Sequence, residues 1–402
     1  MKSGASGRPP GLRASFASPA FTFVFTMGIV NLFADTTYEG GASINGPFFA
    51  LLGAGAAVTS IVAGFGEFLG YSIRLASGWW ADRTGKYWPL TFVGYVVNLL
   101  AVPAMALAGS WPAAAALVLA ERVGRAIRKP TVEAMLSYTT GTLGRGWVYS
   151  LNTALDETGA TLGPIAMAVV LARGGTHRLG YGLLLVPALL TLVTLVVARR
   201  AFPVPSRLEE ERTAPAGGFP RAYKVFLAGS SLFAAGLMSF ELIGYHFAKT
   251  GTIAPRHIPL LLALSTAGGV VANLALGRLY DRVGVRVLLG AVLVTAFFSP
   301  LVFLGGAGAA VAGMMLWGIG YATQDTLFKA IIAGLLPEGR RSLAFGLFYA
   351  GYGVGWLVGS IVTGLLYERS LPALVAFSVG AFLLSIPIFV VAGRASGRRA
   401  GA

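Results

Sequence analysis

Four carboxylates lie within or at the edge of long apolar stretches of the sequence: Asp35, Glu39, Glu67 and Glu241. An ionised side chain at the centre of a bilayer costs about 2.5 to 3.5 kcal/mol on insertion scales, so those that remain usually face a cavity and act there. A carboxyl group in a cavity of low dielectric constant holds its proton more tightly than it does in water. It can therefore load and release that proton near neutral pH, and we predict that at least one of these four residues carries a proton.

Three of these four residues also have a plainer interpretation. Asp35 and Glu39 end the first apolar stretch, so both could lie in water with Asp35 bonded to the local backbone. Glu241 has no evident local partner, although His246 follows five residues later, and it could make an interhelical hydrogen bond. The sequence leaves these alternatives open.

A second group of charges lies in the fourth and fifth apolar stretches. Arg122 and Arg125 are predicted to point inward, paired with Glu121, Asp156 or Glu157. A guanidinium group grips two oxygens at once, so these arginines would suit an anionic or carboxylate-bearing solute. A purely structural network of ion pairs between the two helices explains them equally well.

The second half of the chain offers a third group. Asp325 and Lys329 are four residues apart on one predicted helix and can form an ion pair. Aromatic residues around them are either lining a pathway or packing: Tyr245, Trp317, Tyr321, Tyr349, Tyr352 and Trp356. We count His246, Tyr321, Asp325 and Lys329, with Arg122, Arg125, Asp156 and Glu157, as candidate solute-binding residues.

The same inventory offers little to an enzyme or a metal centre. The chain has no Cys and only three His, and it has no HExxH or Gly-x-Ser-x-Gly arrangement, so we expect neither catalysis nor a cofactor. Asp35, Glu39, Glu67, His246 and Asp325 are ligand types for a divalent cation, but no spacing among them singles out a site. The metal question stays open at this stage.

The elements that must position these residues are membrane-spanning helices. Hydrophobic residues make up 55% of the 402 residues and charged residues only 12%, and the mean hydropathy is +0.72. Apolar runs of about 20 residues are long enough to cross the hydrocarbon core, where only helices or closed barrels satisfy the backbone. We predict twelve helices, near 20–38, 46–76, 88–108, 112–136, 146–172, 178–198, 221–248, 256–279, 287–305, 308–335, 342–367 and 371–393.

The charge distribution predicts the orientation. The net charge of +15 comes mostly from Lys and Arg on the side of the two chain ends. Only a few basic residues are predicted in the opposite loops: Arg173, Arg178, Lys249, Arg256 and Arg369. Because basic loops stay in the cytoplasm, we predict a multi-pass protein of the cytoplasmic (inner) membrane with both termini cytoplasmic. Residues 1–20 are then a cytoplasmic tail, and the positive charge sets topology instead of binding nucleic acid.

Two internal echoes divide the chain into related halves. Gly78, Asp82, Arg83, Gly85 and Lys86 follow the second helix, and Gly277, Asp281 and Arg282 repeat that spacing after the eighth. Gly159-x-x-x-Gly163-Pro164 in the fifth helix is mirrored by Gly355-x-x-x-Gly359 in the eleventh. We therefore predict parallel repeats of six helices each: residues 1–200, a cytoplasmic linker at 201–220, and residues 221–402.

At these residues the chain resembles the major facilitator superfamily, whose signature after helix two is Gly-x-x-x-Asp-Arg-x-Gly-Arg/Lys. The resemblance implies an all-α fold with two six-helix bundles related by a pseudo-two-fold axis. It also implies that Asp82 and Arg83 form a charge-relay contact with neighbouring helix ends, which steadies one conformation. The plainer interpretation is that the basic residues of this motif only set topology.

The glycine pair in helix five resembles the antiporter motif of the same superfamily, although that pattern continues with paired glycines where this chain has Ala166, Met167 and Ala168. Asp35 followed by Thr37 resembles the helix-one aspartate of drug/proton antiporters. Small residues four apart can also be an ordinary helix-packing seam.

Together these features predict a secondary transporter that moves a small solute by alternating access, with proton-coupled export as the leading hypothesis. A divalent metal exporter or a lipid or amphiphile flippase of the same fold are the alternatives. The expected partners are a small-molecule substrate, protons and the lipid bilayer, with no nucleic acid, and we expect a monomer.

Overall fold

The chain folds into helices throughout the part that the structure describes. A computed structural model gives residues 18–137, 139, 145–204, 220–335 and 341–397, and no strand occurs within these ranges. The helical segments make twelve crossings there, as the apolar runs predict. Ten of them are long and apolar enough to span a membrane by length and composition alone.

The two other crossings do not meet these criteria of length and apolar composition, each for a physical reason. One of them, α5 (Trp111–Ser137), carries a dense row of charges that lowers its hydropathy. The other is interrupted by a short π-helix, so that neither of its α-helical parts is long enough by itself. Both crossings carry residues of the charged and aromatic groups described below.

The first six crossings contain the following helices: α2 (Pro19–Leu51), α3 (Ala56–Thr84), α4 (Tyr87–Ala104) with the 3-10 turn η1 (Met105–Leu107), α5, α7 (Arg145–Ala172), and α8 (His177–Leu183) with α9 (Leu185–Ala201). The last six contain α10 (Arg221–Gly236) with α11 (Phe240–Thr250), η3 (Pro255–His257) with α12 (Ile258–Val283), α13 (Arg286–Thr295) with α14 (Phe298–Phe303), α15 (Ala307–Ala322) with the π-helix η4 (Thr323–Phe328) and α16 (Lys329–Leu335), α17 (Arg341–Arg369), and α18 (Leu371–Gly397).

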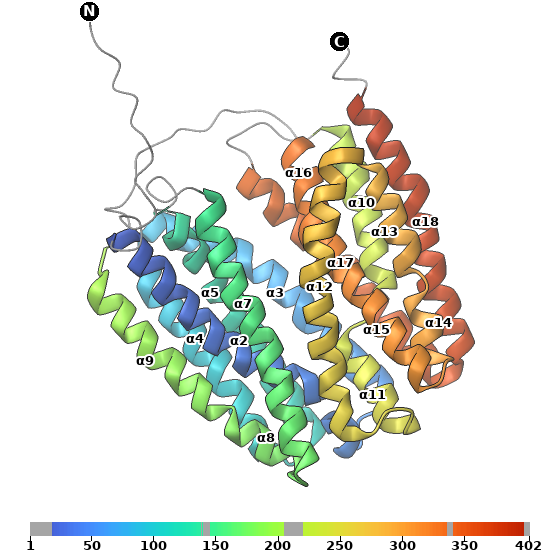
Figure 1. Cartoon of the computed structure of the whole chain (residues 1–402), viewed down its shortest axis with the longest axis horizontal. Coiled ribbons are helices and arrows are strands. Elements are labelled where there is room, and N and C mark those ends of the chain that lie inside the picture. The colour runs from blue at the N-terminus through green and yellow to red at the C-terminus, as the bar shows by residue number, and fades with distance from the viewer. Residues whose placement is uncertain (1–17, 138, 140–144, 205–219, 336–340, 398–402) are drawn as a thin grey trace, which may run out of the picture.

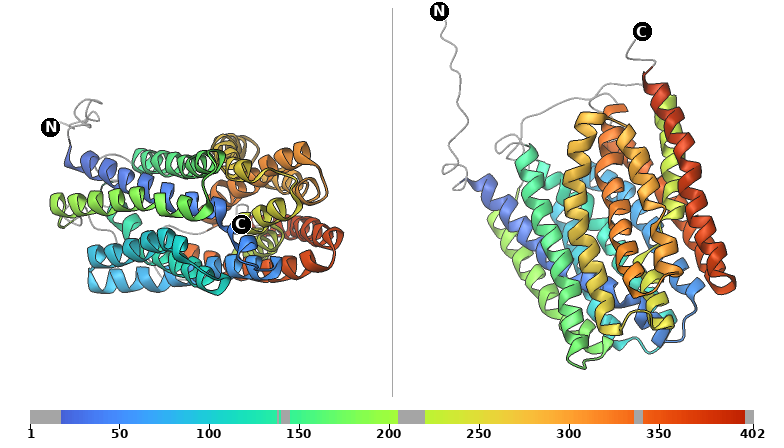
Figure 2. Two further views of the ribbon diagram at one scale, coloured as in Figure 1. Left: turned by 90° about the horizontal axis from the view of Figure 1, so that it is seen from below. Right: turned by 45° about the vertical axis from the view of Figure 1, so that its right-hand side comes forward.

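These helices form two groups that stand side by side (Figure 1). Helices α2 to α9 make one bundle and α10 to α18 the other, with α11 and α12 lying against the first bundle. The bundles meet where α3 packs on α17, α11 on α2, and α12 on α7. Figure 2 shows the same arrangement from below, with the helices of each bundle running roughly along one axis. Helix α2 begins and α18 ends on the same side, which we call the terminal side; the opposite side is the far side.

The first helix is much longer than predicted. The sequence suggested an end near residue 38, but α2 continues to Leu51, and α3 begins only at Ala56. The glycine- and serine-rich stretch that looked like a loop is helical because its small residues face other helices at short range. A Cβ at Gly46 would lie 2.7 Å from the backbone nitrogen of Tyr245, so α2 and α11 are in near-backbone contact there.

The repeated motif lies in the last turns of α3 and α12, which continue beyond the predicted helix ends at residues 76 and 279. Gly78 and Arg83 belong to the last turns of α3, and Gly85 ends that helix in the left-handed conformation with φ 65°. Gly284 ends α12 in the same way with φ 69°, so the two halves share this terminator. A residue with a side chain is strained at such angles, which explains the glycines. The side chains of Asp82 and Asp281 lie outside the described residues.

The glycine pairs of the second repeat are packing seams. Gly159 and Gly163 of α7 face the backbone of α2 at Leu32 and Thr36 so closely that a Cβ would collide. In the other bundle, Gly355 and Gly359 of α17 press in the same way on the backbone of α10. Equivalent helices therefore make equivalent contacts in the two halves, which is the behaviour of small residues four apart in membrane helices.

The seventh crossing is broken where the sequence predicts one continuous helix over 221–248. Helix α10 ends at Gly236, and Leu237 and Ser239 are in extended conformations before α11 starts. The indole of Trp317 donates a 2.8 Å hydrogen bond to the carbonyl oxygen of Met238, which satisfies one backbone group freed by the break. Such breaks persist at membrane depth where protein lines them.

Candidate functional site

The charged residues of the first bundle gather around three arginines of α5 that face α2, α3 and α11. Arg122, Arg125 and Arg128 lie three residues apart, and the predicted alternation of sign along α5 brings Glu121 among them. Arg122 and Arg128 are buried, with 8% and 4% of their surface exposed, as is Glu121 at 7%. Because a buried guanidinium needs compensation, the partners of these groups define the site.

Arg122 is the centre of this site because it forms ion pairs with carboxylates on three helices, its own helix α5 included. Its Nη2 is 3.0 Å from Oε1 of Glu241 on α11, and its Nη1 contacts Oε1 of Glu67 on α3. Its Nε is 3.3 Å from Oε2 of Glu121, the neighbouring residue. The Arg122–Glu241 pair joins the two bundles.

Arg125 strengthens the same network from one turn further along α5. Its Nη2 is 3.0 Å from Oε1 of Glu67, and its Nε is 3.7 Å from Oε1 of Glu121. Its guanidinium carbon lies 4.8 Å from the centre of the Tyr38 ring on α2, within the range of a cation–π contact. Glu67 is therefore shared between two arginines.

Arg128 belongs to a neighbouring cluster that contains Asp35. Its Nη2 is 3.7 Å from Oδ1 of Asp35, and its Nε donates a 3.2 Å hydrogen bond to Asn98. The Asn98 amide in turn donates a 2.8 Å hydrogen bond to Oε1 of Glu121, which links the two clusters. Asp156 of α7 lies within electrostatic reach of Asp35.

The predictions for these residues are partly wrong. Asp35 and Glu39 do not end a helix in water, because α2 continues for three more turns and Asp35 is only 4% exposed. Arg122 and Arg125 pair with Glu121 as one option foresaw, but with Glu67 and Glu241 in place of Asp156 and Glu157. Glu241 has no local partner on its own helix, as predicted; it lies in the first turn of α11, and its bond to Arg122 of α5 is the interhelical hydrogen bond that the sequence left open.

Acidic groups outnumber basic ones in this region. Seven carboxylates and four cations interact there: Asp35, Glu39, Glu67, Glu121, Asp156, Glu157 and Glu241, with Arg122, Arg125, Arg128 and Lys129. Glu39 makes no ion pair within 4 Å in the described part of the chain, although Arg125 and Glu121 lie within its electrostatic reach. With all groups charged, the region carries a surplus of negative charge that protons or a cation would neutralise.

An aromatic ladder faces this acidic region from the second bundle, with one member from α3. Tyr71 of α3 stacks on Tyr349 at 5.3 Å between ring centres, and Tyr352 lies 6.1 Å from Tyr71. The ladder continues through Trp356 and Tyr321 to Trp317. Five of the six aromatic residues singled out in the sequence thus lie together.

One observation relates the ladder to the charged residues, and a second concerns buried polar groups that a solute could contact. The phenol of Tyr321 lies within electrostatic reach of Glu67 and Glu241. The indole nitrogen of Trp356 is buried and has no hydrogen-bond partner among the described residues, and the hydroxyl of Ser239 at the broken crossing is in the same state. Buried donors without partners are costly, and a bound polar solute would supply them.

The π-helix η4 brings further polar groups to the ladder. Gln324 accepts a 2.7 Å hydrogen bond from the hydroxyl of Tyr352, and its amide lies 3.4 Å from the hydroxyl of Tyr71. Asp325 and Lys329 pair at 3.1 Å, as their spacing predicts, with both side chains about half exposed. Glu157 of α7 is within electrostatic reach of Asp325 across the two bundles. Single-turn π segments often mark functional sites.

His246 is separated from these groups. Its Nδ1 is 3.0 Å from the hydroxyl of Tyr367, and its ring packs 4.8 Å from that of Phe303. Tyr245 also packs against Tyr367, away from the ladder. Within the described residues, no three His, Asp or Glu side chains are grouped so that they could hold a metal ion. The five residues named as possible ligands of a divalent cation therefore do not form a metal site within the described residues.

Sequence reasoning missed several residues of the site. Tyr71, Asn98 and Gln324 are ordinary polar residues in apolar stretches, and only the packing of α3, α4 and η4 shows that they face the charged and aromatic groups. Arg128 is not among the candidates named from the sequence, yet it is buried against Tyr95 and Asn98. The sequence did contain a signal for this residue, because Arg122, Arg125 and Arg128 recur at about one helical turn and so fall near one face of the helix.

Comparison with known proteins agrees with this architecture. The family model of the Major Facilitator Superfamily matches residues 225–400. The chain is 32% identical over 378 residues to the uncharacterized protein Rv2265 of Mycobacterium tuberculosis, covering 92% of each chain. It is 24% identical over 361 residues to the uncharacterized MFS-type transporter MJ1317 of Methanocaldococcus jannaschii, covering 86% of this chain and 89% of that one.

Solved structures share the fold at low sequence identity. The nucleoside transporter NupG superposes with a TM-score of 0.72 at 14% identity, covering 92% of this chain and 98% of that one. The peptide transporter POT in complex with sulfate superposes with a TM-score of 0.71 at 15% identity, covering 94% of both chains. Twelve helical crossings, the paired motifs of the two halves and these matches lead to one assignment: the chain belongs to the major facilitator superfamily.

Proposed function

We propose that this protein is a proton-coupled antiporter that exports a small aromatic solute bearing a positive charge. The observation that carries the proposal is the surplus of carboxylates around Arg122, Arg125 and Arg128, opposite an aromatic ladder. All three guanidinium groups already face carboxylates, so an anionic solute would have to compete with these carboxylates for them. A cation can instead replace the protons that neutralise the surplus.

The aromatic ladder supports the solute class. Ring faces attract cations, by about 0.5 to 2 kcal/mol each, and stack on planar solutes. Tyr321 lies within electrostatic reach of Glu67 and Glu241, and the ring of Trp356 is 5.8 Å from that of Tyr321, so we propose that one solute contacts both the carboxylates and the rings. The unpartnered indole nitrogen of Trp356 would donate to a polar atom of the solute.

Competition for the carboxylates supports the coupling. Asp35 and Asp156 lie within electrostatic reach of each other, and a proton on either carboxyl group would relieve their repulsion. A solute that displaces such protons must exchange with them, since antiport requires that the two ligands compete or favour different states. Asp35, Glu39, Glu67 and Glu241 remain the candidate carriers.

The topology is part of the proposal. We propose that the terminal side faces the cytoplasm, because helix ends there carry Arg83, Arg199, Arg200 and Arg286. With the cytoplasmic membrane as its location, protons would enter from the far side and the solute would leave toward it. We also propose that the protein acts as a monomer whose two halves are divided at residues 201–220.

Proteoliposomes provide the test, with tetraphenylphosphonium as the aromatic cation. Imposing an acidic far side should drive this cation toward that side, and adding it should accelerate collapse of the pH gradient. A valinomycin-clamped membrane potential separates proton coupling from simple electrophoresis of the cation. If the clamped vesicles show no cation movement under a pH gradient, or if an aromatic anion moves instead, the proposed function is wrong.

A further inference from the structure

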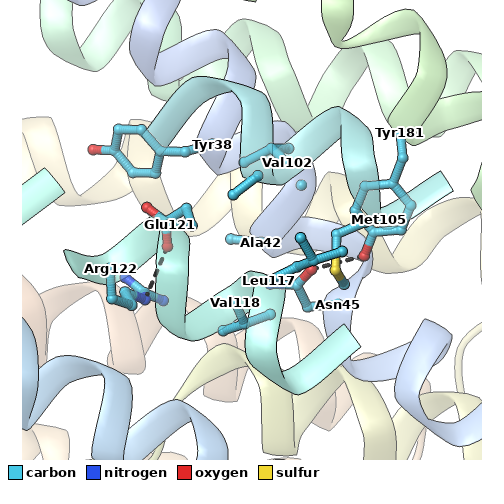
Figure 3. A pocket seen from close by; sticks show the side chains of 12 residues that line it. Tyr38, Ala42, Asn45, Val102, Met105, Leu117, Val118, Glu121, Arg122 and Tyr181 are labelled. Atoms are coloured by element: carbon cyan, nitrogen blue, oxygen red, sulfur yellow. Dashed lines mark hydrogen bonds and ion pairs between the residues drawn. The ribbon is translucent and has the colours of Figure 1, made fainter. Parts of the chain in front are cut away.

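A small cavity lies within the first bundle, and Arg122, which pairs with Glu241 of the other bundle, lines it beside Glu121 (Figure 3). It is lined by residues of α2, α4 with η1, α5 and α8. Its volume of about 10 Å³ is the room that one water molecule needs. No solute of the size handled by transporters would fit, so only a water molecule or a hydrated proton could occupy the cavity.

The cavity has a polar group at each end and apolar walls between. Glu121 lies at one end beside the ring of Tyr38 (Figure 3). At the other end the hydroxyl of Tyr181 donates a 2.7 Å hydrogen bond to Oδ1 of Asn45. Tyr38 and Asn45 are seven residues apart on α2, or about 10 Å along the helix. Because α2 runs toward the far side, the Asn45 end lies nearer that side.

A further polar atom continues this line toward the far side. His177 begins α8 one turn before Tyr181, and its Nε2 is buried without a hydrogen-bond partner in the described residues. Its ring packs 6.4 Å from that of Phe48. Polar atoms of His177, Tyr181, Asn45 and Glu121 are thus spaced along the interior of one bundle.

The contact between the bundles is closed on the far side in this conformation. Gly46 of α2 packs against the backbone of Glu241 and Tyr245 on α11. The carboxylate of Glu368 on α17 accepts a 3.1 Å hydrogen bond from the backbone nitrogen of Ala57, where α3 begins. A solute between the bundles cannot leave on this side without separating them, whereas the cavity inside the first bundle crosses none of these contacts.

From these observations we propose that one water molecule in the cavity, together with the polar groups of Asn45, Tyr181 and His177, forms a path that carries protons between the far side and Glu121, independently of the path of the solute. The inference rests on the proposed proton coupling. A hydronium ion in the cavity would transfer one proton to the Glu121 carboxylate and become water, which removes one negative charge from the network around Arg122. The charged and polar groups that face Glu121 are Glu39, Glu67, Asn98, Arg122, Arg125, Arg128 and Glu241.

Protonation at Glu121 would reach the contact between the bundles through a shared partner. Arg122 pairs with Glu121 and also with Glu241 of the other bundle. When Glu121 is neutral, Arg122 is held by Glu67 and Glu241 alone. Protons from the far side would therefore change the balance of charge at the link between the bundles before that side opens.

Cysteine accessibility tests the path without any solute. The chain has no Cys, so Ala42→Cys, which lines the cavity, can be probed in a silent background. The probe is Ag⁺, which is no larger than a water molecule and reacts with thiols in contact with water. The matched control is Ala126→Cys, fully buried on α5 and outside the cavity. After Ag⁺ has been added to either face of oriented vesicles, the protein is denatured, and protection of the cysteine from a maleimide label measures how far Ag⁺ had reacted.

We expect Ag⁺ from the far side to modify Ala42→Cys at least ten times faster than Ala126→Cys. Equal rates at the two positions, or reaction of Ala42→Cys from the terminal side alone, would overturn the path. Because this result needs neither solute nor proton coupling, it can hold even if the proposed function fails.

A second variant tests the role of the path in proton movement. Asn45→Leu with Tyr181→Phe replaces both hydrogen-bond partners, so neither is left unsatisfied and the fold is expected to persist. The control is Thr91→Val with Thr131→Val, which removes another buried pair, at 2.7 Å, from the same bundle.

With tetraphenylphosphonium inside the vesicles and acid on the far side, the Asn45/Tyr181 variant should take up protons at least tenfold more slowly. Its exchange of the cation at equal pH should match that of the control. An unchanged proton flux in this variant beside a coupled parent would refute the path, whereas a parent without any cation-dependent proton flux would refute the proposed function.

Discussion

At the scale of single residues, Glu39 is the carboxylate whose removal disturbs its neighbours least. It makes no ion pair within 4 Å in the described residues, so Glu39→Gln leaves no arginine without a partner. If Glu39 carries the proton, the variant should lose at least tenfold in gradient-driven transport while solute exchange persists. The parent's transport should fall as the pH of both sides rises, because the carriers lose their protons, and the variant should lose this dependence.

The control for Glu39→Gln is Glu133→Gln, an exposed carboxylate on α5. Its transport and pH dependence should equal those of the parent. If Glu39→Gln also keeps the parent's pH dependence, then Asp35→Asn and Glu241→Gln are the next variants to measure. Unchanged coupling in the amide variants of all four candidates would remove proton coupling from the proposal.

Arg122 has the opposite property, since it compensates several buried acids. Replacing it with Gln removes one ion-pair partner from each of Glu67, Glu121 and Glu241, and Arg125 still pairs with the first two. Breaking a buried ion pair by removing one partner costs about 3 to 5 kcal/mol. Thermal unfolding in detergent should show Arg122→Gln melting well below the parent. Adding Glu241→Gln should recover part of the loss, and a double variant no more stable than the single one would contradict the pairing.

At the scale of elements, the packing seams depend on glycine where two helix backbones touch. A Cβ at Gly163 would collide with the backbone of α2 at Thr36, and backbone cannot move aside as a side chain can. Gly163→Ala should therefore lower the melting temperature by several degrees. Gly182→Ala on α8 meets nothing within 4 Å and is the matched control. Equal melting temperatures for the two variants would show that α7 and α2 separate without cost.

The elements also show how far the sequence could be interpreted alone. Apolar runs of about 20 residues predict the number of crossings, because the bilayer sets that length. They misplace the end of α2, since a row of Gly, Ser and Asn reads as a loop unless one knows that α7 and α11 pack against it. The break before α11 is equally hidden, because no proline or charge marks Leu237 and Ser239.

The site was predictable in composition but not in connectivity. Charges in apolar stretches identify Glu67, Arg122, Arg125 and Glu241 from sequence alone. Their pairing joins residues that are far apart in the chain, such as Arg122 and Glu241, and no periodicity relates residues of different bundles. The same holds for Gln324, whose role depends on the π turn that points it toward Tyr71 and Tyr352.

At the scale of the whole molecule, alternating access requires the bundles to separate on one side and then the other. Helix α3 lies along α17, and the hydroxyl of Ser60 donates a 2.7 Å hydrogen bond to the carbonyl oxygen of Ser360. A disulfide between Ser60→Cys and Ser360→Cys should hold this contact closed. We expect oxidation to reduce transport at least tenfold and dithiothreitol to restore it.

The control crosslink stays within one bundle. Thr91 and Thr131 join α4 to α5 with hydroxyl oxygens 2.7 Å apart, so a disulfide between cysteines at these positions should leave the bundles free to move. Since the chain has no cysteine of its own, no other thiol can form a bond in either variant. Full transport by the oxidised Ser60/Ser360 variant would mean that α3 and α17 never part.

The break in the seventh crossing has a consequence for the exchange of amide hydrogens with solvent. The first amides of a helix have no acceptor within it, and Ser239 does not cap α11 with its side chain. The amides of Phe240 and Leu242 should therefore exchange faster than those of α10, which is continuous from Arg221 to Gly236. A solute bound between Glu241 and the aromatic ladder would cover this turn, so its slowing in mass spectrometry would report occupancy without any transport measurement.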